Sequence, residues 1–433
     1  MSDSATATEK QSMDCLVIQG GRPLSGSVEV SGAKNAALPL MAATLLAPGE
    51  HVITRVPRLA DTATMVRVLE ALGAKVRWDA TGMHVDTRST SSVEAPYELV
   101  KTMRASVYVL GPLLARFGRA RVSLPGGCAW GPRPVDLHIK GMEALGATID
   151  IDEGYIVAAA PAGGVRGTRF DFPISSVGAT GNLLMAAVLA RGTTEITNAA
   201  IEPEITQLAE MLVAMGAQIE GIGTTHLTVE GVGDLSPTTI EVIPDRIEAG
   251  TYLAAGAMTL GDVTITRCRP AHLAATLHAL ENTGSRVTIE GSTVSLQSQG
   301  RPRGADLTTA VFPGFPTDMQ AQMMAVATIA EGTSTITDTI YHDRFAHAPE
   351  LARMGADIRV TDNVAVVTGR DRLKGAPVMA TDLRASAALV LAGLAAEGET
   401  RVSRIYHLDR GYEALADKLA TLGAQVERRR ESE

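Results

Sequence analysis

The chain has 433 residues, of which 45% are hydrophobic, 3% are aromatic and 42 are glycine. This length is more than one hydrophobic core usually holds, so we expect two domains. The composition is that of a globular α/β protein rather than a disordered or fibrous one. The formal net charge of −9 argues against sequence-independent nucleic-acid binding, which requires a basic face. Any anion that the protein binds must therefore be held by a local cluster of Arg and Lys.

The N-terminal residues 1–14 are polar and lack the apolar core of a signal peptide, so we expect a disordered tail. No segment approaches the roughly 20 consecutive apolar residues that a membrane span requires. The three cysteines, Cys15, Cys128 and Cys268, are far apart and form no CxxC motif. This spacing argues against a disulfide framework or a zinc site and favours a reducing, cytoplasmic location.

The first elements after the tail define a pattern. Residues 15–20 (CLVIQG) predict a strand, and residues 35–47 predict a helix that is apolar nearly all round and so must be buried. A glycine ends this helix, and residues 50–56 predict a strand. Residues 61–73 then predict an amphipathic helix, and the alternating residues 74–86 predict a hairpin.

This pattern recurs along the whole chain. A short phrase with a central glycine, as in LGAKV, LGATI and MGADI, returns every 68–73 residues. Its glycines are Gly73, Gly146, Gly216, Gly284, Gly355 and Gly423. Six copies of one unit therefore fill the chain, and the prediction is an α/β fold of six βαβαββ-type repeats.

The two ends of the chain complement each other. The sixth copy ends without a second hairpin strand, while the strand at Cys15–Gly20 has no local partner. We predict that this strand completes the last repeat, because an open solenoid would instead need polar caps at both ends. Closure implies three repeats per domain and two crossings of the chain, near Ser31–Lys34 and near Val242–Asp245. The predicted domains are residues 34–243, with the loop around Cys128, and residues 15–33 together with 244–433.

Charged residues recur at the amino ends of the buried helices. These residues are Lys34, Arg104, Arg246, Asp318 and Arg384. Cations are unfavourable there because the helix dipole already places partial positive charge at that end. Helix ends that converge on a strongly anionic ligand would explain them. The alternative is that each cation pairs with a nearby carboxylate, such as Asp245 or Asp382.

Two of the candidate residues leave alternatives open. Asp318 lies in a first helical turn, where it is either a capping acid or a general base among the cations. Cys128 lies between glycines in LPGGCAWGPRPVDLH (Leu124–His138), and glycines seldom flank a core cysteine. A nearby Arg133 would lower the thiol pKa from about 8.5, which favours a reactive thiol over a small buried side chain. His342 and His347 lack a third ligand, so no metal site is predicted.

Six motifs, in order and with matching spacing, resemble those of the UDP-N-acetylglucosamine 1-carboxyvinyltransferase family, the enolpyruvyl transferases of peptidoglycan synthesis. They are SGAKNAALP (31–39), KTMRAS (101–106), LPGGC with RPVDLH (124–138), FPTDMQAQ (315–322), ATDLRASA (380–387) and YHLDRGYE (406–413). The similarity runs from about Cys15 to about Arg428. It implies a two-domain inside-out α/β barrel with three repeats per domain.

The resemblance also implies an activity. Phosphoenolpyruvate is protonated at its methylene carbon, the 3-hydroxyl of UDP-N-acetylglucosamine attacks the neighbouring carbon, and phosphate leaves from a tetrahedral intermediate. This is the first committed step of peptidoglycan synthesis, a cytoplasmic reaction that uses no metal or other cofactor. The only partners expected are these two small-molecule substrates, with no nucleic acid, membrane or obligate protein partner. Retention of Cys128 implies alkylation by fosfomycin.

Residue roles follow by motif. Lys34, Arg104, Arg133 and Arg410 are implied to contact phosphoenolpyruvate or the leaving phosphate. Asn35 would contact the sugar, and Asp318 would take the hydroxyl proton. Cys128 would lie on a lid that closes over the substrate, its glycines permitting the movement. Asp382 and Arg384 would order the site. The residues implied to hold the nucleotide are Pro134, Val135, Asp136, Leu137, His138, Ser176, Val177, Gly178, Arg246, Ile340 and Arg344.

Two other functions compete with this interpretation. A 5-enolpyruvylshikimate-3-phosphate synthase-like enzyme would share fold and chemistry, but it has no comparable loop cysteine and its first motif differs from AKNAALP. A non-catalytic UDP-sugar-binding sensor could keep the nucleotide contacts alone. It is disfavoured because Cys128, Asp318 and the set of cations are all present.

Overall fold

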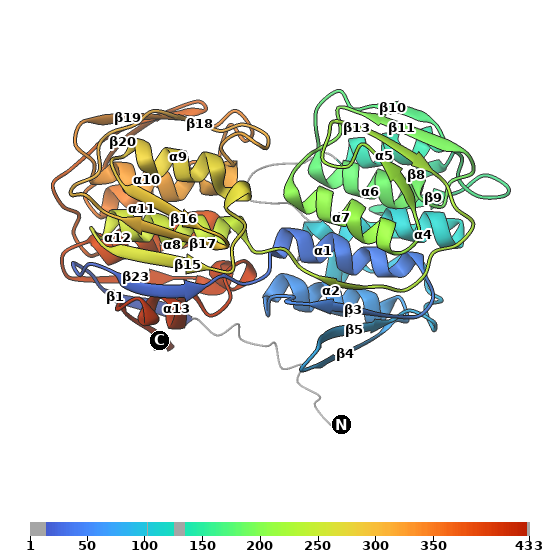
Figure 1. Ribbon diagram of the computed structural model, residues 1–433, viewed down its shortest axis with the longest axis horizontal. Coiled ribbons are helices and arrows are strands. Elements are labelled where there is room, and N and C mark those ends of the chain that lie inside the picture. The colour runs from blue at the N-terminus through green and yellow to red at the C-terminus, as the bar shows by residue number, and fades with distance from the viewer. Residues whose placement is uncertain (1–13, 102, 125–134, 431–433) are drawn as a thin grey trace, which may run out of the picture.

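The computed structural model describes residues 14–101, 103–124 and 135–430. Figure 1 shows the chain in two halves that lie side by side. We call residues 34–243 the first half, and residues 14–33 with 244–430 the second half. The predicted tail (1–14) falls outside the described residues except for Asp14, which begins the first strand.

In the described part of the chain, the strands form six four-stranded sheets built on one plan. A short strand pairs in parallel with a central strand, which pairs antiparallel with one strand of a hairpin. The first half holds β14 (Thr239–Glu241)–β3 (Glu50–Thr54)–β5 (Gly82–Asp86)–β4 (Lys75–Asp79), β6 (Glu94–Ala95)–β7 (Arg119–Ser123)–β9 (Tyr155–Ala159)–β8 (Thr148–Asp152), and β10 (Arg169–Asp171)–β11 (Thr193–Thr197)–β13 (His226–Glu230)–β12 (Gln218–Glu220). The second half holds β2 (Ser25–Glu29)–β15 (Asp262–Thr266)–β17 (Thr293–Gln297)–β16 (Arg286–Glu290), β18 (Leu307–Thr308)–β19 (Thr333–Thr337)–β21 (Val364–Thr368)–β20 (Asp357–Thr361), and β22 (Pro377–Met379)–β23 (Glu399–Ser403)–β1 (Asp14–Gln19)–β24 (Gln425–Arg430). This repetition confirms the predicted α/β fold.

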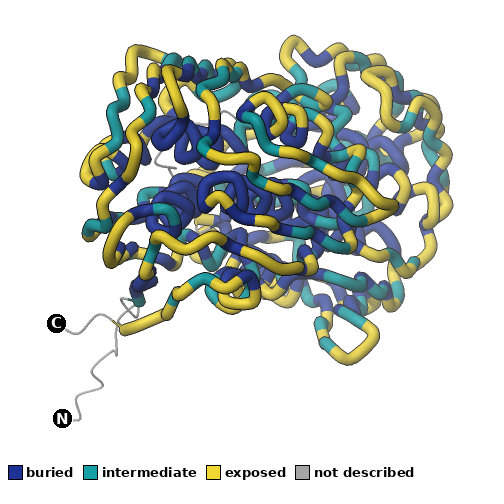
Figure 2. The backbone as a smooth tube through the Cα atoms, turned by 60° about the vertical axis from the view of Figure 1, so that its left-hand side comes forward, coloured by how far each residue is buried: buried dark blue, intermediate teal, exposed yellow. Residues whose placement is uncertain are grey.

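Each central strand follows a helix that is buried nearly all round. These helices are α1 (Lys34–Ala43) with η1 (Thr44–Leu46), η2 (Arg104–Val109) with α4 (Leu110–Phe117), α6 (Val177–Ala187), α8 (Arg246–Met258), η4 (Thr317–Met319) with α10 (Gln320–Thr328), and α12 (Leu383–Ala395). Their apolar sequences leave no polar face for solvent, so they pack inside the sheets. Figure 2 shows the buried coils in the interior and the exposed backbone around them.

The other helices join central strands to hairpins, apart from α3 (Tyr97–Val100), which lies beside η2. They are α2 (Ala60–Ala71), α5 (Asp136–Ala144), α7 (Pro203–Ala214), η3 (Pro270–Leu273) with α9 (Ala274–Asn282), α11 (Ala348–Arg353), and η5 (Ile405–Arg410) with α13 (Leu415–Thr421). The six repeat glycines follow these helices with φ between +89° and +111°. Side chains rarely adopt this left-handed conformation, which explains why the phrase recurs around a glycine.

The N-terminal strand occupies a distinctive place. β1 lies between β23 and β24 and is antiparallel to both, with Leu16 opposite Val402 and Arg428. In the other five described sheets, the second strand of the local hairpin occupies this position. β1 thus takes the place of the second hairpin strand, which the sixth repeat lacks.

Where the chain crosses between the halves, each crossing follows a short strand that pairs within its own half. β14 pairs with β3 and β2 pairs with β15, although the chain leads from β2 into α1 and from β14 into α8. The crossings meet at an antiparallel bridge between Gly32 and Pro244, inside the two ranges expected from the sequence. Close approach requires a glycine there, because a Cβ at Gly32 would overlap the carbonyl oxygen of Arg55.

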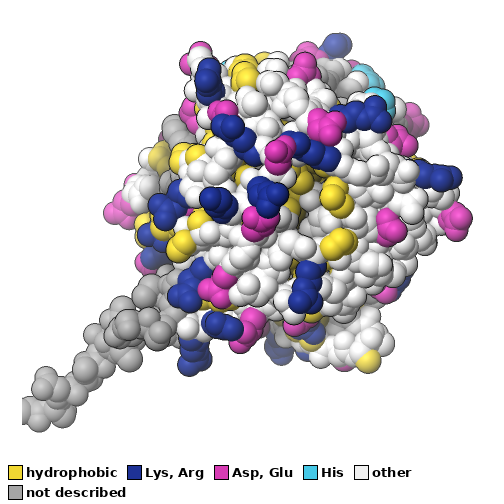
Figure 3. Space-filling model, turned by 90° about the vertical axis from the view of Figure 1, so that its left-hand side faces the viewer, with side chains coloured by type: hydrophobic (Ala, Val, Ile, Leu, Met, Phe, Trp, Pro, Cys, Tyr) yellow, Lys and Arg dark blue, Asp and Glu magenta, His cyan; other side chains and the backbone are white. Residues whose placement is uncertain are grey.

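Two hydrophobic cores are found among the described residues. One spans Ala33 to Ile243, and the other combines Leu16–Val30 with Ile247–Leu422. We propose on this basis that residues 34–243 and residues 15–33 with 244–433 are the two domains. Across the described ranges, no helix combines the length and apolar character needed to span a membrane. On the face of the second half in Figure 3, basic and acidic side chains are interspersed.

Gly32→Ala is expected to reduce the free energy of unfolding by about 1–3 kcal/mol, because the added methyl group would overlap the carbonyl oxygen of Arg55 and crowd Val242. Gly233→Ala is the matched control. No described atom lies within 4 Å of a Cβ at Gly233, so its stability should change by less than about 0.5 kcal/mol. Urea unfolding followed by circular dichroism measures both variants. Equal stability of the two would contradict the close-approach argument.

Candidate active site

The charged residues that the sequence places at helix starts occupy those positions. Lys34 begins α1, Arg104 begins η2 and Arg246 begins α8. Asp318 lies in η4, and Arg384 lies in the first turn of α12. The remaining buried helix, α6, begins at Val177, directly after the uncharged Ser176, whose hydroxyl accepts a hydrogen bond from the backbone N–H of Ala179 at 3.4 Å.

One cluster of these charges joins the two halves. The carboxylate of Asp61 in α2 accepts from Lys34 Nζ at 3.0 Å and from Arg410 Nε at 2.9 Å. Lys34 belongs to the first half, whereas Arg410 ends η5 in the second half. Burial alone would raise the pKa of Asp61, but the two cations outweigh it and hold the pKa below its usual value. Asp61 therefore remains a carboxylate.

A second cluster surrounds Asp318. Its two carboxylate oxygens accept from Arg344 Nη2 at 2.8 Å and from Arg384 Nη2 at 3.2 Å. Burial would raise the pKa of Asp318, but Arg384 and Arg344 lower it further than burial raises it, and Lys34 adds to the lowering. The charge of Lys34 thus helps to keep both Asp61 and Asp318 ionised.

Arg384 retains the capacity to bind another acceptor. Its side chain is 2% exposed, and its Nε and Nη1 atoms make no hydrogen bond within the described part of the chain. Buried donors are usually paired, because an unpaired one costs about 1–3 kcal/mol. Asp382 does not bind this guanidinium. It caps α12 by accepting from the backbone N–H groups of Arg384 at 2.9 Å and Ala385 at 3.2 Å.

The carboxylate-pairing alternative holds for several cations, but with partners other than those considered from the sequence. Arg246 does not pair with Asp245, which instead caps α8 by accepting from two backbone N–H groups. Arg246 Nε donates to Glu204 at 3.1 Å, across the two halves. Lys34 and Arg384 likewise pair with distant acids, Asp61 and Asp318. Lys34, Arg246 and Arg384 are therefore each balanced by a carboxylate from another helix.

The residues implied to hold the nucleotide lie on several segments. Asp136, Leu137 and His138 form the first turn of α5, directly after Val135. The ring of His138 packs against Gly178, where an added Cβ would lie 3.1 Å from two ring atoms. His138 Nδ1 lies 2.8 Å from Asn182 Nδ2, and burial lowers the pKa of His138 to about 4, so the ring is neutral and can accept this bond.

Other predicted residues are placed with less detail. Val177 begins α6 and Asn35 follows Lys34 in α1. Ile340 is half-buried, and its backbone N–H donates to Asp338 at 2.9 Å. Cys128, Arg133 and Pro134 lie outside the described residues, so the predicted lid and its thiol stay predictions.

Sequence reasoning missed Asp61 and Glu204. Each lies in the first turn of a helix, where acidic residues commonly favour the helix dipole, so neither stood out. The available signal was the set of cations itself, because several buried cations require counter-charges.

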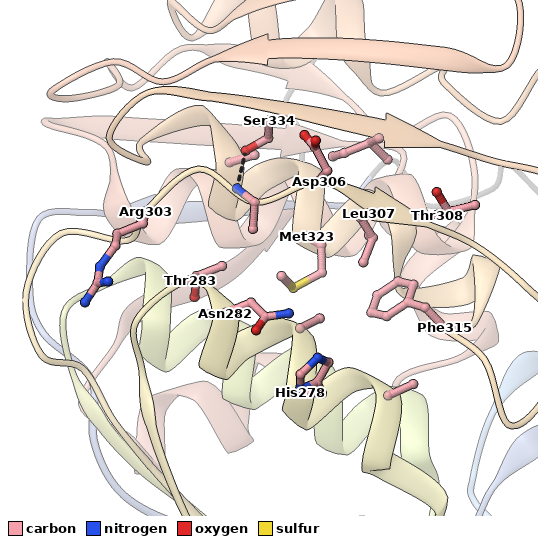
Figure 4. Close-up of a pocket in the computed structure, with 15 residues that line it drawn as sticks. His278, Asn282, Thr283, Arg303, Asp306, Leu307, Thr308, Phe315, Met323 and Ser334 are labelled. Carbon is pink, nitrogen blue, oxygen red and sulfur yellow. Dashed lines mark hydrogen bonds between the residues drawn. The ribbon is translucent and has the colours of Figure 1, made fainter.

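A cavity of about 270 Å³ lies in the second half, between α9, α10 and the strands β18 and β19. Figure 4 shows Met323, Leu307 and Phe315 lining it, with His278 and Asn282 projecting from α9. It contains none of the predicted site residues. In the residues described, no group of three or more His, Cys, Asp or Glu side chains could hold a metal ion.

Comparisons with known proteins identify the family. A family model described as EPSP synthase (3-phosphoshikimate 1-carboxyvinyltransferase) matches residues 18–419. The chain is 57% identical over 422 residues to UDP-N-acetylglucosamine 1-carboxyvinyltransferase of Chlorobium phaeovibrioides, covering 97% of this chain and 100% of that protein. It is 56% identical over 420 residues to the protein of the same name from Anaeromyxobacter sp., covering 96% and 99%.

Solved structures agree with this assignment. The enolpyruvyl transferase NikO from Streptomyces tendae has a TM-score of 0.87 and 28% identity, covering 97% of this chain and 100% of that one. EPSP synthase from Acinetobacter baumannii, with a TM-score of 0.73 and 18% identity over 96% of this chain, shares the fold. Because relatives more than half identical span nearly the full length of both chains, this chain belongs to the UDP-N-acetylglucosamine 1-carboxyvinyltransferase family of enolpyruvyl transferases.

Proposed function

We propose that this protein transfers the enolpyruvyl group of phosphoenolpyruvate to the 3-hydroxyl of UDP-N-acetylglucosamine and releases inorganic phosphate. The observation that carries the proposal is the identity of 57% to a relative of that name over 97% of the chain. The reaction is expected in the cytoplasm, where both substrates occur, and is the first committed step of peptidoglycan synthesis.

The anionic ends of phosphoenolpyruvate require cations that are already in place. Lys34 and Arg410 come from opposite halves and lie on the two sides of Asp61, and both keep donors that Asp61 does not use. Fixed cations stabilise the charge that develops on the departing phosphate more effectively than water does. Arg104 and Arg133, by resemblance to the family, would complete this set.

The transfer needs a base for the sugar hydroxyl and an acid for the methylene carbon. Asp318 is proposed to accept the hydroxyl proton as the oxygen attacks C2 of phosphoenolpyruvate, while the methylene carbon C3 gains a proton. The tetrahedral intermediate then loses phosphate from C2 and a proton from C3, which restores the double bond. Protons and electrons balance without a redox partner.

Asp318 is a weak base while two guanidinium groups hold it, because they keep its pKa well below the usual value. An anionic substrate that draws Arg344 or Arg384 toward itself would raise the pKa of Asp318. Base strength would then increase only when the substrates are bound. The unused donors of Arg384 make it the more suitable of the two for this exchange.

Phosphate release separates the competing functions. Mixing the protein with phosphoenolpyruvate and UDP-N-acetylglucosamine should release inorganic phosphate, and shikimate 3-phosphate should not replace the nucleotide. Release with shikimate 3-phosphate alone would favour the shikimate-pathway activity. Nucleotide binding without turnover would indicate a sensor.

Asp318→Asn should lower kcat by about 10²–10⁴-fold, because the amide cannot take the hydroxyl proton. Binding of UDP-N-acetylglucosamine, measured by calorimetry, should persist. Asp371→Asn is the control, since Asp371 also pairs with an arginine but its side chain is 85% exposed. A kcat for Asp318→Asn equal to that of the control would exclude Asp318 as the base.

Cys128→Ser should abolish covalent labelling by fosfomycin, because the thiolate is the nucleophile. Intact-protein mass spectrometry should show one added inhibitor mass in the native protein and none in the variant. Cys268→Ser is the control and should still be labelled, since Cys268 is buried and burial raises its thiol pKa. Labelling that persists in Cys128→Ser would assign the reactive thiol to another residue.

A further inference from the structure

Asp61 presents a problem that the proposed function leaves unexplained. Its side chain is 6% exposed, and its carboxylate lies between two cations that the proposal assigns to phosphoenolpyruvate or its phosphate. A fixed negative charge should weaken the binding of an anion nearby. A carboxylate at this position therefore requires a function that outweighs this electrostatic cost.

The hydrogen bonds of Asp61 use only part of each cation. Oδ1 accepts from Nε of Arg410, which is the inner nitrogen of the guanidinium group, so this bond leaves the donors of the two terminal nitrogens unused. Oδ2 accepts one of the three N–H bonds of Lys34. The Arg410 side chain is 36% exposed, so part of it remains accessible to a ligand.

A second contact holds the same two segments together. Glu413, three residues after Arg410, accepts from the backbone N–H of Arg58 at 2.7 Å and from the hydroxyl of Ser31. Arg58 lies three residues before Asp61, and Ser31 lies at the crossing between the halves. The start of α2 and the end of η5 are therefore joined by two contacts, one through Glu413 and one through Asp61. Of these two acids, Asp61 is the one that binds Lys34 and Arg410.

We propose that Asp61 is a positioning residue for the phosphate-binding cations. It holds Nζ of Lys34 and Nε of Arg410 at a fixed separation across the two halves, and it turns their remaining donors toward the phosphate group of phosphoenolpyruvate. Without Asp61 the two cations repel each other and the guanidinium group rotates freely. Asp61 weakens the net attraction of the site for phosphate, but it orients the donors of Lys34 and Arg410 before the substrate binds. The orientation outweighs the weaker attraction, because misplacement of a binding group by about 1 Å can cost about 10²-fold in rate. This inference rests on the proposed function.

The test compares Asp61→Asn and Asp61→Glu with the native protein. The first keeps the shape and removes the charge, and the second keeps the charge but moves the carboxylate by one methylene group. Both should lower kcat/KM for phosphoenolpyruvate by about 10²-fold and weaken product inhibition by inorganic phosphate by about 10-fold. The KM for UDP-N-acetylglucosamine should change by less than about 3-fold, which a general loss of structure would not allow.

Glu413→Gln is the matched control. It removes a carboxylate charge from the same contact between the halves without touching Lys34 or Arg410, and its inhibition by phosphate should equal that of the native protein. Phosphate inhibition that is unchanged or tighter in either folded Asp61 variant would overturn the proposal, because Asp61 would then merely compete with phosphate. If Asp61→Asn does not fold, as judged by its thermal midpoint, Asp61→Glu decides alone. Absence of turnover in the native protein would instead refute the proposed function.

Discussion

Buried cations paired with carboxylates from other elements of the fold hold the site together. A cation removed from water is costly unless a counter-charge and hydrogen bonds replace the solvent. Asp61 meets this requirement for Lys34, and Asp318 meets it for Arg344 and Arg384. The protein thus keeps a concentration of positive charge at one place although its net charge is −9. A polyanionic substrate can then displace a carboxylate from these cations, or bind beside it, and the cations are already desolvated.

The fold makes this concentration possible because it repeats one unit. Each repeat places a fully buried helix inside its sheets, and the amino ends of these helices carry the charged residues. An apolar helix has room for a charge only at its end, where backbone N–H groups also point outward. Two ion pairs, Asp61–Arg410 and Glu204–Arg246, then connect the first half to the second half at this site.

Much of this arrangement could be predicted from the sequence because it has a local signature. The period of about 70 residues, the glycines after the outer helices and the charges at helix starts are all visible in short windows. Ion-pair partners have no such signature. Asp61 lies 27 residues from Lys34 and 349 residues from Arg410, so only the assembled repeats bring the three together. The same reason explains why Arg246 was matched with its neighbour Asp245 rather than with Glu204.

The position of β1 has a consequence for synthesis of the chain. Its Gln19 meets Glu399 across 380 residues, so β1 can pair with β23 only after the long segment between them has been synthesised. The first half has all its repeats in one continuous segment and can form its core much earlier. An unpaired apolar strand is prone to associate with other chains during such a delay. An unpaired β1 is therefore a segment through which the nascent chain can aggregate until β23 and β24 are available to cover it.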